Sequence, residues 1–302
     1  MIMIWIVLAA LLGAAERVGP EDGRRRSIDR RDLRTDARWV ALYLVYVPAL
    51  GTAIAAATSV AWLHSPAREL VGGMPWGLQF GGGLVVAELA AYWVHRLQHA
   101  VQALWRIHSV HHSSETLRWW SAFRSHPVDT AVSHGVPVIV AAACGAGPGV
   151  LVPYVATVTV VTVLAHADVY LPGRQAAVAV VTPAFHRSHH EFGRETTNFA
   201  LVLPLCDVVF RTASFTVGAR SFGSASRVPR HGVLAQLAWG FGAQRVSATP
   251  SASEAMLAHA LVPSATIGAT RRSDSIAASP ITTDTSVMTR AAARPAGPSR
   301  TG

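Results

Sequence analysis

Long runs of apolar residues alternate with short, strongly polar segments along this chain of 302 residues. The run at 39–63 contains no charged side chain and is long enough to cross the ~30 Å hydrocarbon core of a bilayer. Charged residues make up 14% of the chain, whereas a soluble domain of ordinary composition carries about a quarter. The sequence therefore predicts membrane-spanning helices rather than the core of a soluble protein.

The apolar runs predict an all-α integral membrane protein with four to five transmembrane or re-entrant helices. The first run lacks the basic start and the cleavage site of a signal peptide, so we interpret it as a short span. A turn rich in Gly and Pro at 145–149 breaks the last run and predicts a hairpin of two short helices. The predicted membrane segments are 1–15, 39–63, 75–94 and the hairpin 132–165.

The arginine-rich segment 16–38 is predicted to be a cytoplasmic loop, because positively charged loops tend to stay on that side. The second span then leads outward, the third returns, and the hairpin enters and leaves on one side. Every histidine-rich segment thus reaches the cytoplasmic face, where we expect a helical cap on a bacterial inner membrane.

Composition divides the chain into three parts. A short span and an arginine-rich loop occupy 1–38, the membrane domain occupies 39–216, and an extension occupies 217–302. From about residue 247 the extension is rich in Ser, Thr, Ala and Pro without an apolar period, which predicts disorder.

Histidines cluster in the polar segments at spacings that share a helical face. His95 and His99 lie one turn apart, on a helix expected to continue from the third span. An H-x-x-H-H pattern occurs at 108–112 and again at 186–190, and this spacing directs three imidazoles into the same space. His166 stands alone where the hairpin re-emerges. The clustered histidines are His95, His99, His108, His111, His112, His186, His189 and His190.

Eight or nine imidazoles in a repeated pattern indicate a centre of two metal ions. Imidazole binds Fe, Zn, Cu and Ni, so the ligand type alone selects no metal. A structural zinc site uses four ligands and is usually rich in thiolate, whereas the chain has two cysteines, Cys144 and Cys206. Two iron ions can supply the electrons that activate O₂ as co-substrate, which side chains alone cannot do. We therefore favour iron, with zinc as a metal that purified protein can also carry.

The stretch 88–210 resembles the fatty acid hydroxylase/sterol desaturase superfamily of membrane di-iron proteins, in its bacterial branch. The resemblance is carried by the three histidine groups, by Arg124-Ser-His126-Pro127, His166-Ala-Asp168 and Asn198-Phe199, and by the closing motif at 206–212. It implies that the eight clustered histidines are metal ligands, that His166 is a ninth ligand, and that Asn198 is a polar neighbour of the site.

One spacing and the departures from two family motifs bear on the subfamily. The first and second histidine groups are close in sequence, as in the hydroxylase and sterol-oxidase branch. The family often has Asn where this chain has Asp168, and its closing motif is commonly Trp-Asp-x-x-Phe-Gly-Thr, which here begins with Cys206 and has Arg211 in place of Gly. Neither change falls on a predicted ligand.

Several other polar residues lie near the histidine groups. Metal-bound imidazoles usually donate their second N–H to a carboxylate or a carbonyl, and Glu88, Asp129, Asp168, Glu191 and Asp207 are candidates for that role or for solvated surface charges. Glu88 lies inside the third span, where a buried acid needs a partner, so we expect it to face the site. His126 is a candidate ligand or neighbour outside the main set. We interpret His64, His134, His231 and His259 as hydrogen-bonded residues without a metal.

The resemblance implies an O₂-dependent di-iron oxidoreductase that hydroxylates or desaturates a C–H bond of a lipid-like substrate from the bilayer. Fatty acyl chains, sterols, carotenoids and ether lipids all fit this description. The sequence shows no flavin or nicotinamide motif and no cysteine set for an iron–sulfur cluster, so the expected electron donor is a separate reductase, ferredoxin or cytochrome. Nucleic-acid binding is disfavoured because the arginines lie beside apolar spans. The alternative is a membrane metal- or haem-binding protein without oxygenase activity.

Overall fold

The structure is a computed structural model, and it describes residues 2–20, 29–171, 179–215, 221–224 and 226–242. These residues are all-helical, apart from an isolated antiparallel bridge between Glu191 and Phe222. The chain divides into two units, Met1–Pro263 and Ser264–Gly302, and the second lies outside the described residues. The predicted disordered tail and His259 also fall outside them. The all-α prediction is confirmed for the part of the chain that is described.

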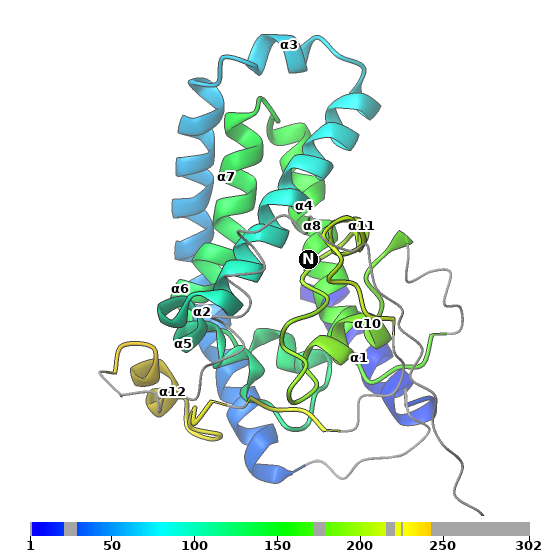
Figure 1. The fold of residues 1–302 in the computed structure, drawn as a ribbon, viewed down its shortest axis with the longest axis vertical. Coiled ribbons are helices and arrows are strands. Elements are labelled where there is room, and N and C mark those ends of the chain that lie inside the picture. Colours follow the sequence, from blue (N-terminus) through cyan, green and yellow to red (C-terminus); the bar gives the residue numbers. More distant parts are fainter. Residues whose placement is uncertain (1, 21–28, 172–178, 216–220, 225, 243–302) are drawn as a thin grey trace, which may run out of the picture. The chain divides into compact units, whose positions relative to one another are not determined.

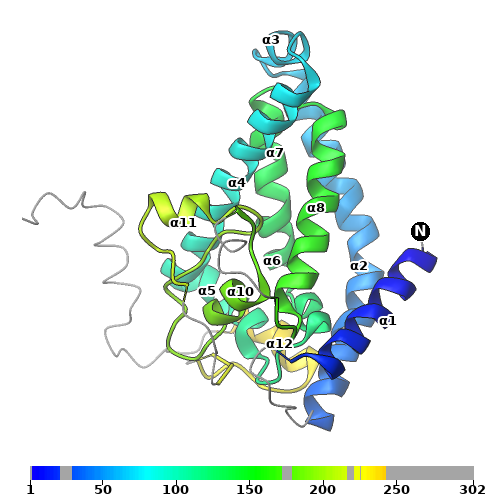
Figure 2. The same ribbon diagram turned by 90° about the vertical axis from the view of Figure 1, so that its right-hand side faces the viewer.

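Four apolar helices lie side by side and form what we call the apolar bundle: α2 (Arg30–Leu63), α4 (Trp76–Ala100), α7 (Val136–Ala143) and α8 (Pro148–His166) (Figures 1 and 2). Their contact includes small residues, since Ala87, Ala141 and Ala142 are all fully buried beside larger apolar side chains. A side chain on Gly83 would place its Cβ 2.6 Å from Val150, so this glycine lets α4 and α8 approach closely. Small residues at helix contacts are typical of membrane bundles.

The hairpin predicted over 132–165 is present as α7 and α8. The turn between them passes through Gly145, whose φ of +97° falls in the left-handed region that favours glycine. The same helical stretch begins earlier than expected, with α6 (Pro127–Thr130) and the π-helical turn η3 (Ala131–Gly135) running into α7.

The outer faces of the apolar bundle expose large apolar side chains, among them Leu44 and Val45 of α2, Leu78 of α4 and Val152 of α8. Among the described helices, α2 and α8 are long and apolar enough to cross a membrane, and Pro127–Ala143 is a shorter apolar helix. The predicted number of four to five spans stays a prediction.

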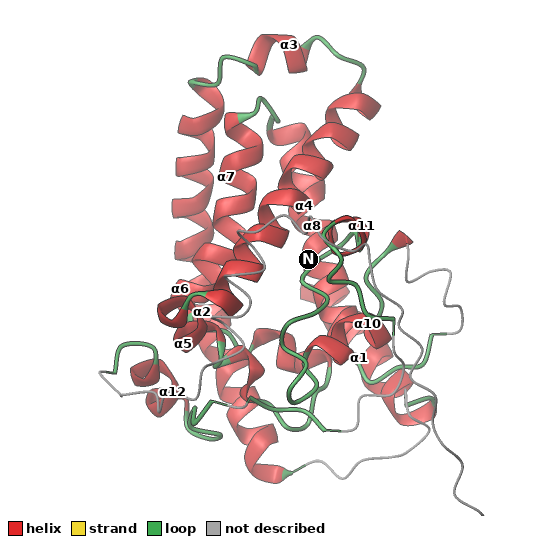
Figure 3. Ribbon diagram, in the orientation of Figure 1, coloured by secondary structure: helices red, strands yellow, loops and turns green. Residues whose placement is uncertain are grey.

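Short helices and loops gather at one end of the bundle and form what we call the histidine cap (Figures 2 and 3). Its loops, drawn green in Figure 3, contrast with the continuous helices of the bundle. The cap comprises α5 (Gln102–His108), η1 (His111–Ser113), η2 (Trp119–Phe123), α6, α10 (Pro183–His189), α11 (Leu205–Val209) and α12 (Val233–Trp239), with their connections.

The arginine-rich segment is not a simple loop. Helix α1 (Ile2–Val18) continues past the first apolar run, and α2 begins at Arg30, where the Asp29 carboxylate caps the helix by accepting from the Arg31 N–H. The first turns of α2 are helical because their two faces differ: Asp32 and Asp36 are buried, whereas Arg30 and Arg34 are exposed. The loop prediction is therefore wrong for the described parts of 16–38, and residues 21–28 lie outside them.

Candidate metal centre

Five elements carry the nine predicted ligands: α4, α5, η1, α8 and α10 with its C-terminal cap. Helix α4 runs without interruption from the bundle into the cap and ends with His95 and His99 on one face, as the sequence predicted. His166 is the last residue of α8. Helix α10 starts with Pro183 behind the Thr182 cap and presents His186 and His189, with His190 at its C-terminal cap. The helices thus bring together histidines that are far apart in the sequence.

The H-x-x-H-H pattern at 108–112 does not lie on one continuous helix, and that prediction is wrong. Helix α5 ends at His108, and His111 and His112 belong to the 3₁₀ turn η1. The planes of the two adjacent rings lie at 89°, close to the 87° between His189 and His190. In both patterns the adjacent histidines therefore point into different groups.

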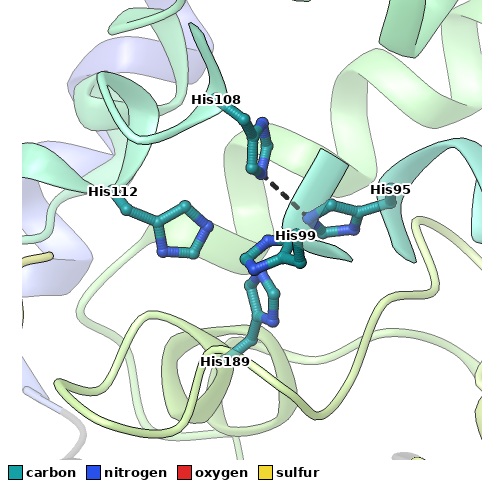
Figure 4. Close-up of side chains that lie close together, drawn as sticks. All are labelled: His95, His99, His108, His112 and His189. Atoms are coloured by element: carbon teal, nitrogen blue, oxygen red, sulfur yellow. Dashed lines mark hydrogen bonds between the residues drawn. The ribbon is translucent and has the colours of Figure 1, made fainter. Parts of the chain in front are cut away.

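The nine imidazoles form two adjacent groups, and within each group the ligand nitrogens all lie within 4.8 Å of one another. Figure 4 shows the rings of the first group turned toward a common centre. The two groups touch, since the His112 and His190 rings are stacked with their centroids 4.2 Å apart. The first histidine group is His95, His99, His108, His112 and His189, and the second is His111, His166, His186 and His190.

Backbone carbonyls hold the Nδ1 atoms of four of these rings. His95 Nδ1 lies 2.7 Å from Phe199 O, and His189 Nδ1 lies 2.6 Å from Thr197 O. In the second group, His166 and His111 contact the carbonyls of Thr162 and Arg124, at 2.7 and 3.2 Å. A carbonyl accepts only, so each Nδ1 carries the proton and each Nε2 keeps its lone pair free. This is the arrangement of a metal-ligating histidine.

His108 has a carboxylate in the same role. Its Nδ1 lies 2.9 Å from the Asp129 carboxylate, and Asp129 also accepts hydrogen bonds from Gln98 and Ser125. Asp129 was one of several acidic candidates in the sequence, and here it is the one in direct contact with a clustered ring. Gln98 was not predicted as part of the site, although it lies between two predicted ligands of α4 in the sequence.

The free Nε2 atoms face one another. His95 Nε2 lies 3.1 Å from His108 Nε2, and His111 Nε2 lies 3.2 Å from His166 Nε2. With both Nδ1 atoms protonated, neither nitrogen of such a pair has a proton to donate, so no hydrogen bond joins them. Facing lone pairs repel, and a cation shared between them removes that repulsion. The donor set therefore fits metal ions in both groups.

The remaining unpaired nitrogens support the same fit. His99 Nε2, His189 Nε2 and both ring nitrogens of His112 are buried without a hydrogen-bond partner among the described residues. Buried polar atoms are ordinarily paired, and a coordinated ion would satisfy these. Burial and then the neighbouring imidazoles lower the pKa of His112, His189 and His190 well below its ordinary value. The rings are therefore neutral near pH 7, as ligation requires.

The segment 197–203, which we call the acceptor segment, supplies the carbonyls for His95 and His189. Asp207 fixes it by accepting from the Phe199 and Ala200 N–H groups, and Glu88 does so from the Val202 and Leu203 N–H groups. The prediction that Glu88 faces the site is wrong, because these amides and the Tyr154 hydroxyl occupy its carboxylate. Glu88 and Asp207 act on the rings through the backbone.

Asn198 ties the acceptor segment to α10. It adopts a left-handed backbone with a φ of 61°, and its side-chain amide donates to Phe185 O and Ser188 Oγ. It also exchanges hydrogen bonds with the Ser214 backbone. Asn198 is thus a neighbour of the histidines, as the resemblance implied, and contacts none of their ring nitrogens in the described structure.

Buried ion pairs brace the second histidine group from behind. Asp168 lies 2.9 Å from Arg187, which follows His186, and 3.6 Å from Arg118. Glu16 of α1 accepts from the Trp119 and Asp168 N–H groups, which anchors the first helix to the cap. Asp168 was a candidate ligand or neighbour, and it belongs to neither histidine group.

His126 also stands outside both groups. Its Nδ1 caps α6 by accepting from the Val128 N–H, and its ring packs against Phe241. His64 contacts the Val60 carbonyl, and His231 lies 3.6 Å from Asp32. His134 differs from these, because it lines the cavity beside the histidines.

These features define, for the described residues, a helical protein with a buried, two-part histidine centre at one end of an apolar helical bundle. Comparison with known proteins is consistent with that class: residues 80–212 match the fatty acid hydroxylase family model. The matched stretch contains every ligand candidate, so the similarity to the fatty acid hydroxylase family covers the whole candidate centre.

The chain is similar to curated relatives with related names. An ornithine lipid hydroxylase from Rhizobium tropici is 31% identical over 171 residues, which are 55% of this chain and 51% of that protein. The human fatty acid hydroxylase domain-containing protein 2 is 27% identical over 43% of this chain and 38% of its own. A Delta(7)-sterol 5(6)-desaturase from Gibberella zeae is 27% identical over 36% and 34%. The chain thus spans about half the length of these relatives or less. No solved structure matches it.

Proposed function

We propose that the chain is a membrane-bound, O₂-dependent di-iron enzyme that hydroxylates or desaturates a C–H bond of a lipid. The observation that carries this proposal is the pair of histidine groups whose Nδ1 atoms are held by acceptors and whose Nε2 atoms converge. Similarity to the fatty acid hydroxylase family and the names of the three relatives support a lipid substrate.

In this proposal, different residues bind the metal ions, orient the ligand rings and exclude water. The first and second histidine groups would each hold one iron ion, and the bound pair supplies the oxidising chemistry that activates O₂. Asp129 and the acceptor segment orient the rings, and the buried walls exclude bulk water, which protects a reactive site from side reactions. Electrons would come from a separate reductase, ferredoxin or cytochrome.

The exposed apolar faces of α2 and α8 support insertion in a membrane. The charge pattern supports a cytoplasmic cap on a bacterial inner membrane, because the exposed arginines of α2 lie at the cap end of that helix. A topology assay with reporters fused near the cap and near α3 (Arg68–Gly72) tests this placement.

The first experiment measures metal in detergent-purified protein by elemental mass spectrometry, beside the double variant His111→Ala/His189→Ala. Each substitution removes one ligand from one group, so we expect about two irons per chain in the natural protein and a loss of most of that metal in the variant. Oxygen consumption with added lipids should fall with the metal, by about 100-fold or more, because ligand loss removes the oxidising centre.

Membrane insertion of the double variant is the control, and it should match that of the natural chain. Undiminished metal in the variant would refute the ligand assignment. Bound metal without oxygen consumption would favour a metal-binding protein that is not an oxygenase, and a haem Soret band would favour the haem alternative.

A further inference from the structure

A cavity of about 70 Å³ adjoins the candidate centre. This is space for several water-sized groups, at roughly 10–15 Å³ each. Side chains of α2, α4, η3 and α8 form the walls on the bundle side, and five clustered histidines form the other side: His95, His108, His111, His166 and His186. A substrate atom in this cavity would lie next to both histidine groups.

Most polar side chains in the cavity wall bind one another. Gln98 donates to Asp129 and Ser133, and Ser125 is hydrogen-bonded to Asp129 and Thr130. These side chains therefore already have hydrogen-bond partners within the protein.

Three polar side chains in the same wall have no such partner. The Thr162 hydroxyl is buried and makes no hydrogen bond to any described residue. The Tyr43 hydroxyl and the His134 ring likewise make none within the described part of the chain, and both line the cavity. They come from three different elements, α2, η3 and α8, and meet at this one space.

Their convergence has a physical consequence. An unpaired polar group in a protein interior costs free energy, so buried polar side chains are nearly always paired. The Thr162 hydroxyl is such a buried, unpaired group, and it indicates a ligand in the cavity. Tyr43 and His134 are half-buried, and their position in the same wall makes them further partners for that ligand. His134 also lies on a π-helical turn, and such turns are rare and frequent at functional sites.

We propose that the cavity binds a hydroxyl, ester or amide group of the lipid substrate, through Tyr43, His134 and Thr162. This inference rests on the proposed function and narrows the substrate class: the oxidised carbon lies a few bonds from a hydrogen-bonding group. Tyr43 and Thr162 each offer a hydroxyl donor, and neutral His134 offers one donor and one acceptor, so the three serve a carbonyl or a hydroxyl. A pure hydrocarbon such as an alkane would leave all three unpaired.

The test compares two probes of matched chain, N-hexadecylacetamide and hexadecane, both radiolabelled. Binding is measured at equilibrium to the metal-loaded protein in lipid nanodiscs. We expect the amide to bind more tightly than the alkane. Tyr43→Phe, Thr162→Val and His134→Leu should each weaken amide binding by about 2–10-fold, the loss of one hydrogen bond, and leave alkane binding unchanged.

Tyr46→Phe is the matched control for Tyr43→Phe. It removes the same atom one turn along α2, but the Tyr46 hydroxyl is bonded to Thr130 and to the Ser125 carbonyl instead of facing the cavity. Tyr43→Phe and Thr162→Val keep the shape of the side chain, so they remain informative if His134→Leu does not fold.

Equal binding of the two probes would overturn the inference, as would an effect of Tyr43→Phe no larger than that of Tyr46→Phe. Metal content and oxygen consumption of the natural chain are measured separately and decide the proposed function. A metal-loaded, oxygen-consuming protein that prefers the alkane would therefore refute this inference alone.

Discussion

The apolar bundle and the histidine cap are stabilised by different kinds of interaction. In the bundle, small apolar residues of α4, α7 and α8 pack together, and few side-chain hydrogen bonds link the helices. In the cap, buried charged and polar groups pair with specific partners, as Arg124 does with Asp36 and His108 with Asp129. A bundle residue can thus be replaced by another of similar volume, whereas a cap residue has a specific partner that its loss leaves buried and unpaired.

Removing the Arg124 guanidinium from the cap should give the largest loss of stability. Arg124 is fully buried, donates to Asp36 at 2.6 Å and to Ser113, and its carbonyl accepts from His111. Arg124→Met leaves the buried Asp36 without a cation among the described residues, and Asp32 with Arg230 as its remaining arginine, at the longer distance of 3.7 Å. We therefore expect a loss of about 3–5 kcal/mol in the free energy of unfolding. Unfolding by SDS titration measures it.

Arg230→Met is the control for this prediction. Arg230 lies 2.8 Å from Glu115, and both of these side chains are more than 40% exposed. Its contacts to Asp29 and to the buried Asp32 are longer, at 3.4 and 3.7 Å, and Asp32 keeps Arg124 as a partner when Arg230 is replaced. Exposed pairs contribute about 0–1 kcal/mol, so this variant should stay close to the natural stability. Similar losses of unfolding free energy in the two variants would show that burial does not determine how much an ion pair stabilises the cap.

Asp129→Asn tests whether the carboxylate behind His108 increases the metal affinity of the first histidine group. The amide keeps the size of the carboxylate but loses its charge, so it holds the His108 N–H less strongly. We expect metal affinity to fall by about 10–100-fold, as for other carboxylates behind ligating histidines. Competition with a chelator of known affinity measures it.

The matched acidic control for Asp129 lies at the opposite end of the molecule. Glu69 in α3 is exposed, and Glu69→Gln should leave metal affinity unchanged. An Asp129→Asn variant with the metal affinity of the natural chain would show that the charge of this carboxylate does not contribute to metal binding.

The two regions also differ in how far the sequence predicts them. Hydropathy predicted the helices of the bundle, because burial in apolar surroundings depends on residue type along the chain. The histidine spacing predicted eight members of the two groups, because turns of a helix fix which side chains meet, and the resemblance added His166. The spacing did not predict how the histidines divide between the groups, nor the 3₁₀ turn that follows α5.

The partners of the rings were the least predictable part. Phe199 and Thr197 contribute carbonyl oxygens, which every residue has, so sequence gives no sign of them. The burial of Asp36 likewise depends on Arg124, far away along the chain. Glu88 was assigned to the site because it is an acid in an apolar helix, yet the backbone amides that pair with it are distant in sequence. Long-range partners of this kind appear only when the fold is known.

Gly83→Ala makes the smallest expected change and tests the bundle alone. The new Cβ would lie 2.6 Å from the Val150 side chain, so α4 and α8 must shift apart, at a cost of about 1–3 kcal/mol. Gly82→Ala is the control: its Cβ meets nothing within 4 Å, and alanine favours a helix over glycine by up to about 1 kcal/mol. Adding Val150→Ala should rescue Gly83→Ala by making room. Metal per folded chain should stay constant in all of these variants, because Gly83 lies several turns before His95; a loss of metal would mean that bundle packing and the histidine cap are coupled.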